Sequence, residues 1–212
     1  MKKTLRTAAS AAVATVAVVT TGVVVTASTG PGSAAAAPAD QSGFGYTTIR
    51  KGVPDSAERF TVTSPDVRDG GAFPAGNWAD SFGCTGANRQ IRLSWSGAPR
   101  ATRSYAITMF DRDAPTGAGF WHWLVWDVPA SRHGVGPQLP AGAVAGTGDA
   151  GTVGYLGPCP PSGDITHHYE ISVYALDVPT LQLPATTTPT IAAFTMSGHV
   201  IGQARITATA RR

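Results

Sequence analysis

The feature that most restricts the fold of this chain is a series of short segments rich in β-branched and aromatic residues, separated by clusters of Gly, Pro and Asp. Such spacing is typical of β-strands joined by turns. The segment 105–110 is apolar at nearly every position, as expected for a central strand covered on both faces. Strands are predicted at 60–63, 91–95, 105–110, 121–128, 169–176 and 203–209.

One helix is predicted near the C-terminus. Thr188 can cap it, Pro189 suits its first turn, and apolar residues follow as far as Gly198. This helix is too short to dominate the fold. The pattern therefore predicts a mainly β domain.

The first 39 residues are predicted to be a secretory signal peptide. Three cations precede an Ala/Val/Thr-rich run at 8–27, and a small-x-small cleavage site ends at Ala39. A membrane anchor is the alternative, but Thr and Gly residues dilute the run. We expect cleavage after Ala39, a freely secreted protein, a Gly- and Ser-rich arm over 40–48, and one domain over 49–212.

The charge of the chain changes once the leader is set aside. Three of the 16 Lys and Arg residues precede Asp40, whereas all 13 Asp and Glu residues lie at or beyond it, so the remaining chain is formally neutral. A general basic field for nucleic acid is therefore absent. We expect no nucleic-acid partner, and no stable membrane insertion after removal of the leader.

Cys84 and Cys159 both lie in the part predicted to be exported, where the environment is oxidising. Export therefore favours a disulfide between them. Two buried free thiols are the alternative, since the sequence does not give the distance between the two residues.

Two polar segments carry most of the residues that could do chemistry. The first is DRDAPTGAGFWHWLVWDVP at 111–129, and the second is GYLGPCPPSGDITHHYEISVYALD at 154–177, which closes a long Gly- and Pro-rich stretch. Long loops of this kind are usually functional. Together the two segments resemble the Asp-Pro-Asp-Ala-Pro motif, the Trp/His strand and the His-x-Tyr strand of the phosphatidylethanolamine-binding protein family, in its bacterial Raf kinase inhibitor-like branch.

Weaker agreement with this family extends over CTGAN at 84–88, LSWSGAP at 93–99 and SGHVIGQARI at 197–206. The resemblance implies an antiparallel β-sandwich with a short C-terminal helix. One departure is Arg112, which stands where the family motif has proline and leaves the local backbone and ligand choice open.

The resemblance implies a non-catalytic pocket that holds a small anion, such as phosphate or a phosphorylated headgroup, with no cofactor. Imidazole and phenol groups can donate hydrogen bonds to such an anion. Strand alternation independently places His167 on the face of Tyr169, and His168 on the opposite face. The pocket residues implied by the family are Asp111, His122, His167 and Tyr169, with Asp113, Pro115 and Pro160 shaping the wall.

Other functions remain open at this point. Members of the family also restrain partner enzymes, which makes a secreted peptidase a candidate partner. A metal-dependent hydrolase would use Asp111, Asp113, His122 and His167 as ligands. Catalysis by a serine nucleophile is disfavoured because Ser162 lacks the strand-turn-helix context of a nucleophile elbow.

Overall fold

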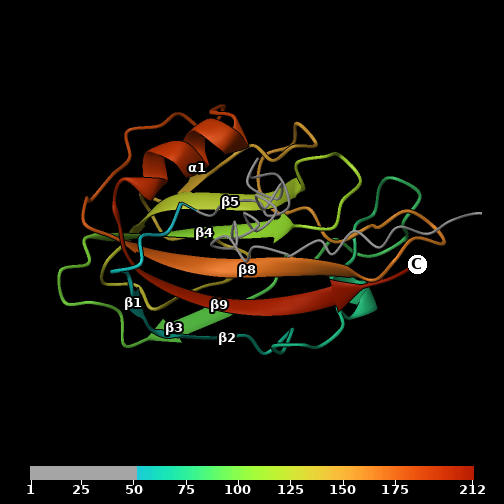
Figure 1. Cartoon of the computed structure of the whole chain (residues 1–212), viewed down its shortest axis with the longest axis horizontal. Helices are drawn as coiled ribbons and strands as arrows, with labels where there is room; N and C mark the ends of the chain where they lie inside the picture. Colours follow the sequence, from blue (N-terminus) through green and yellow to red (C-terminus); the bar gives the residue numbers. More distant parts are fainter. Residues whose placement is uncertain (1–51) are drawn as a thin grey trace, which may run out of the picture. The chain divides into compact units, whose positions relative to one another are not determined.

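The computed structural model describes residues 52–212, labelled as in Figure 1. The predicted signal peptide and the arm at 40–48 lie outside the described residues. Within 52–212, no helix has the length and apolar character needed to cross a bilayer.

A six-stranded sheet forms the centre of the domain (Figure 1). Neighbouring strands run antiparallel, except for the parallel pair at one edge. In spatial order the strands are β1 (Glu58–Arg59), β9 (Val200–Ala210), β8 (His167–Leu176), β4 (Ser104–Asp111), β5 (Phe120–Pro129) and β7 (Val144–Ala145).

A second sheet of three short antiparallel strands packs on one face of the first. It consists of β2 (Thr61–Thr63), β3 (Leu93–Ser96) and β6 (Gly134–Val135). One hydrophobic cluster joins both sheets, with Leu93 and Trp95 packed among Ile107, Met109 and other residues of the large sheet. This cluster is the larger of the domain's two main cores.

The opposite face of the large sheet is covered in part by helix α1 (Pro189–Ser197), as Figure 1 shows. Ala192 and Met196 of the helix pack against Leu124 and Tyr174 of the sheet. Because both faces are covered, every residue of β4 is buried, as the apolar segment at 105–110 predicted. A short 3-10 turn, η2 (Ala75–Asn77), precedes β3.

The prediction of a mainly β domain with a short C-terminal helix is confirmed, and the helix begins after Thr188 as expected. The prediction of an antiparallel sandwich needs correction. β1 pairs with β9 in parallel, and the sheets do not form a closed sandwich because the second one has only three short strands.

Candidate functional site

A pocket of about 380 Å³ lies at one end of the large sheet. Asp111 ends β4, whereas His122 and His167 lie at the beginnings of β5 and β8. Since β4 is antiparallel to both neighbours, these three strand ends meet at the same edge. All three side chains are buried, so they form a polar floor. The walls are mostly apolar and include Pro115, Phe120, Leu156, Pro160 and Pro161, with Phe82 and Arg212 exposed at the rim.

His167 lies between two carboxylates. Its Nδ1 lies 2.7 Å from Asp111 Oδ2, and its Nε2 lies 3.3 Å from Asp164 Oδ2. Burial lowers the pKa of His167, but hydrogen bonds to the two carboxylates and their charges outweigh burial and raise the pKa above its usual value. His167 therefore keeps its proton, and its positive charge, to a higher pH than an ordinary histidine.

His122 reaches the pocket through a β-bulge. Met109 pairs with Trp123 and Phe110 pairs with Trp121, so His122 is an extra residue on β5. Without the bulge, alternation would place it on the face of Leu124, away from the pocket. Burial lowers the pKa of His122 to about 4, although the charge of Asp111 acts in the opposite direction. His122 is thus neutral at pH 7, and its pKa moves in the opposite direction from that of His167.

Tyr169 lies fully buried next to the floor. Its ring packs edge-on against His122, with centroids 5.1 Å apart, and also against Phe73. Its hydroxyl makes no hydrogen bond of normal geometry with the described residues. Burial raises the pKa of this phenol, and the charge of Asp111 raises it further. Tyr169 is not among the residues that line the pocket.

Asp113 also lies away from the pocket lining. Its Oδ2 accepts a hydrogen bond from the His168 backbone N–H at 2.7 Å and lies 2.8 Å from His168 Nδ1. The family resemblance implied that Asp113 shapes the pocket wall, and strand alternation would place it on the face of Asp111. Because β4 ends at Asp111, alternation does not extend to Asp113. The four side chains of the metal hypothesis are therefore not gathered at one point.

A disulfide joins Cys84 to Cys159, with the two Cα atoms 5.9 Å apart. Cys159 of this bond and the nearby Phe82 both line the pocket. The guanidinium of Arg212 lies against the two sulfurs, with Nη1 3.2 Å from Cys84 Sγ and 3.6 Å from Cys159 Sγ. The disulfide thus holds one wall of the pocket and supports the cation at its rim.

Sequence reasoning missed Phe82, Leu156 and Arg212, which line the pocket, and Asp164, which contacts His167 without lining the pocket. Asp164 lies three positions before His167, and that spacing is the one signal that could have identified it. The other three are brought in by loops and by the end of β9, and no motif marks them. Pro115 and Pro160, in contrast, lie in the lining where the family resemblance placed them.

Comparison with known proteins identifies the family. A family model described as phosphatidylethanolamine-binding protein matches residues 63–211. The UPF0098 protein YbcL of Escherichia coli (strain K12) is 37% identical over 159 residues, which cover 71% of this chain and 87% of YbcL. The putative lipoprotein LppC of Mycobacterium tuberculosis is 38% identical over 165 residues, covering 77% of this chain and 78% of LppC.

Solved structures agree with this assignment. The crystal structure of E. coli YbcL, described as a new member of the mammalian PEBP family, superposes with a TM-score of 0.70 at 36% identity and covers 72% of this chain and 98% of YbcL. A putative PEBP homologue, CT736 from Chlamydia trachomatis, gives a TM-score of 0.64 at 28% identity, with coverages of 74% and 99%. The chain belongs to the phosphatidylethanolamine-binding protein family.

Proposed function

We propose that this protein binds a small anion, phosphate or a phosphorylated headgroup, in the pocket described above and does not turn it over. The observation that carries the proposal is the contact between His167 Nε2 and a carboxylate oxygen of Asp164. In this contact an anionic oxygen faces the imidazole of His167, which lines the pocket, although Asp164 itself does not line it. A bound anion would take the position of that oxygen.

Asp164 is suited to give way to a ligand. It lies in the loop before β8, its side chain is 32% exposed, and its contact with His167 is longer than that of Asp111. Asp111, in contrast, is buried and stays with His167. The rim adds Arg212, whose guanidinium is a permanent cation. The apolar walls exclude water around these charges and thereby strengthen their interaction with an anion.

Binding without turnover is supported by the lack of an activated nucleophile among the lining residues. Cys159 is held in the disulfide. The hydroxyl of Thr116 donates a hydrogen bond to the Gly119 carbonyl at 2.6 Å, so it is engaged in the turn. His122 and His167 then act as binding groups rather than as the base of a catalytic pair.

The test is calorimetric titration of the purified protein with phosphate and with phosphoethanolamine, in a buffer free of phosphate and carboxylates. Both ligands are expected to bind the parent protein. The Asp164→Asn variant should bind about tenfold more tightly, because the competing charge is removed. Asp177→Asn, which changes an exposed carboxylate paired with His199, serves as the matched control. Absence of binding by both the parent and Asp164→Asn contradicts the proposal.

Export belongs to the same proposal. The disulfide is typical of oxidising compartments, and the relative LppC is named a putative lipoprotein. N-terminal sequencing of the protein recovered from the medium is expected to begin at Asp40. The peptidase partner stays a prediction of the family resemblance.

A further inference from the structure

The pocket offers a ligand a lone pair as well as N–H groups. His122 Nδ1 lies 3.2 Å from the carbonyl oxygen of Leu156, which can only accept a hydrogen bond. Nδ1 must therefore carry the hydrogen, and Nε2 of the neutral ring then carries a lone pair. Since His122 lines the pocket and its Nδ1 is engaged by Leu156, we assign Nε2 as the nitrogen that meets a ligand.

The surroundings of His122 keep this ring neutral. Burial is the largest effect and opposes the protonated form, as does the charge of His167 of β8, whereas Asp111 of β4 and the backbone of Leu156 and Gly157 favour it. The neighbouring Tyr169 phenol is uncharged because burial raises its pKa. The other charged groups near the pocket are Asp164, which contacts His167 without lining the pocket, and Arg212 at the rim.

Asp111 also presents acceptor oxygens to the pocket. One of its oxygens accepts the backbone N–H of Asp113 at 2.9 Å, and the other faces His167 at 2.7 Å. A carboxylate has about four lone-pair sites, so acceptor capacity remains. The pocket floor therefore combines a cationic donor, His167, with two acceptors, His122 Nε2 and Asp111.

We propose that the pocket selects an anion that retains one O–H group, the monoanion of phosphate or of a phosphate monoester, and rejects sulfate, sulfate esters and phosphodiesters. This inference rests on the proposed function. The charged oxygens of the ligand face His167 Nε2 and Arg212, while the O–H donates to His122 Nε2.

The chemistry of the excluded anions follows from that arrangement. Sulfate is fully ionised near neutral pH, and a phosphodiester has no O–H, so either would place an oxygen lone pair against the lone pair of Nε2. An unsatisfied buried acceptor of this kind weakens binding by roughly 10- to 100-fold. A phosphate monoester, whose second pKa is about 6, still carries the required proton over part of the range near neutrality.

The first test compares ligands of matched size on the unmodified protein at pH 6. Methyl phosphate and inorganic phosphate are expected to bind, and methyl sulfate and dimethyl phosphate to bind about 100-fold more weakly. Equal affinities for methyl phosphate and methyl sulfate would overturn the inference and leave the proposed function standing. Failure of all four ligands to bind would overturn the proposed function itself.

A further arm separates free phosphate esters from lipid headgroups. Glycerophosphoethanolamine is a phosphodiester, as an intact lipid headgroup is, and phosphoethanolamine is a monoester with the same amine. The monoester is expected to bind about 100-fold more tightly. A tighter complex with the diester would contradict the requirement for an O–H group.

The second test uses pH. For a monoester with a second pKa of about 6, the affinity should fall roughly fiftyfold between pH 6 and pH 8, and about one proton should be taken up on binding at pH 8. Methylphosphonate and a fluorinated phosphonate of lower pKa distinguish the ligand's titration from that of His167. The pH at which affinity has fallen by half is expected to follow the pKa of the ligand. If that pH is the same for both ligands, the inference is refuted.

The third test changes the acceptor. In His122→Gln the side-chain amide can present an N–H to the ligand, so the preference for methyl phosphate over methyl sulfate should shrink to a few-fold. His199→Gln, at an exposed histidine paired with Asp177, is the control that should keep the full preference. A His122→Gln variant that keeps the preference contradicts the assignment. If this variant does not fold, the first two tests decide the question on the parent protein.

Discussion

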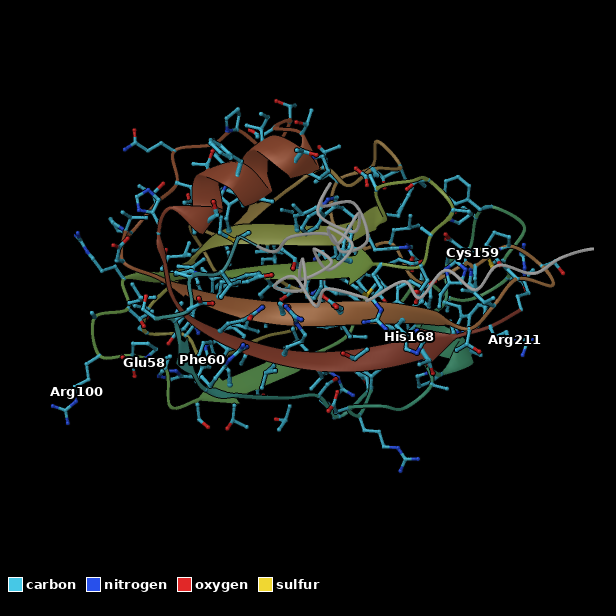
Figure 2. All side chains as sticks on the ribbon, viewed as in Figure 1. Glu58, Phe60, Arg100, Cys159, His168 and Arg211 are labelled. Carbon is cyan, nitrogen blue, oxygen red and sulfur yellow. A yellow bond between two sulfur atoms is a disulfide. The ribbon has the colours of Figure 1, made fainter. Side chains whose placement is uncertain are left out.

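Two neighbouring histidines on β8 each contact an aspartate through Nδ1, on opposite sides of the large sheet. His167 lies 2.7 Å from Asp111, and both side chains are almost fully buried, at 1% and 3% exposure. His168, labelled in Figure 2, lies 2.8 Å from Asp113, with exposures of 40% and 21%. The residue types and distances match, and the environments differ.

The comparison shows that a histidine–aspartate contact alone does not create a binding site, and that burial of the two side chains is also needed. A buried ion pair is held by low dielectric and leaves a costly charge when it is broken, whereas an exposed pair is screened by water. Only the buried pair meets a second carboxylate and an enclosed pocket. The exposed pair is therefore a natural control for every experiment on the buried one.

Loss of the disulfide is expected to have the largest effect on the buried side. Replacing Cys84 and Cys159 with Ser should lower the free energy of unfolding by about 4–5 kcal/mol, because the bond closes a long loop in the unfolded chain. Urea unfolding of the variant and the parent measures this change. Anion affinity should fall as well, since Cys159 forms part of the pocket wall. An unchanged affinity would show that the wall does not need the bond.

Replacing His167 with Ala should come next in size. The buried Asp111 charge would lose its partner, so we expect a loss of about 3–5 kcal/mol in the free energy of unfolding and no measurable anion binding. His168→Ala should lower the free energy of unfolding by less than about 1 kcal/mol and leave anion affinity nearly unchanged. Calorimetry and urea unfolding test both. Equal losses in the two variants would contradict the distinction between the two sides.

The two pocket histidines should respond to acid with opposite signs. The pKa of His167 is raised in the folded state, so its stabilisation is present below the unfolded value of about 6.5 and is lost as pH rises through the folded value. The pKa of His122 is lowered to about 4, so the folded state is penalised as pH falls from about 6.5. The penalty from His122 should reach about 3 kcal/mol by pH 4.

Urea unfolding between pH 7 and pH 4 tests this expectation when the parent is compared with His122→Gln. The variant should lose less stability over the range, because glutamine does not titrate. Parallel pH profiles for the two proteins would show that His122 is not held neutral by the fold.

Arg212 should have the smallest of these effects because it lies at the exposed rim. Arg212→Gln is expected to weaken anion binding about tenfold and to reduce its dependence on salt. The neighbouring Arg211, labelled in Figure 2, does not line the pocket, so Arg211→Gln is the matched control. A similar loss in both variants would indicate a general charge effect rather than a contact at the rim.

Much of the fold could be predicted from the sequence because its local signals agree with its packing. The apolar segment of β4 predicted a strand covered on both faces, and Thr188 and Pro189 marked the beginning of α1. The parallel edge pair β1–β9 could not be predicted, since β1 has only two residues and both are exposed.

The site was less accessible to sequence reasoning, for physical reasons that differ from residue to residue. Strand alternation correctly predicted that His167 lies on the same face of the sheet as Tyr169, because both residues belong to the regular strand β8. It gave the wrong surroundings for Asp113, which follows the end of β4, and it could not describe His122, which lies in a bulge. Arg212 depends on the chain end reaching the disulfide, a long-range contact that no local pattern encodes.

The meeting of three strand ends at one edge also bears on how this pocket can change during evolution. The floor residues Asp111, His122 and His167 are fixed by the ladder of the large sheet, whereas the walls come from the loops at 112–119 and 157–163. Substitutions, insertions and deletions accumulate more readily in loops than in central strands. A lineage can therefore alter the size and shape of the ligand it accepts while inheriting the charged groups unchanged, and an engineer could do the same by exchanging these two loops between relatives.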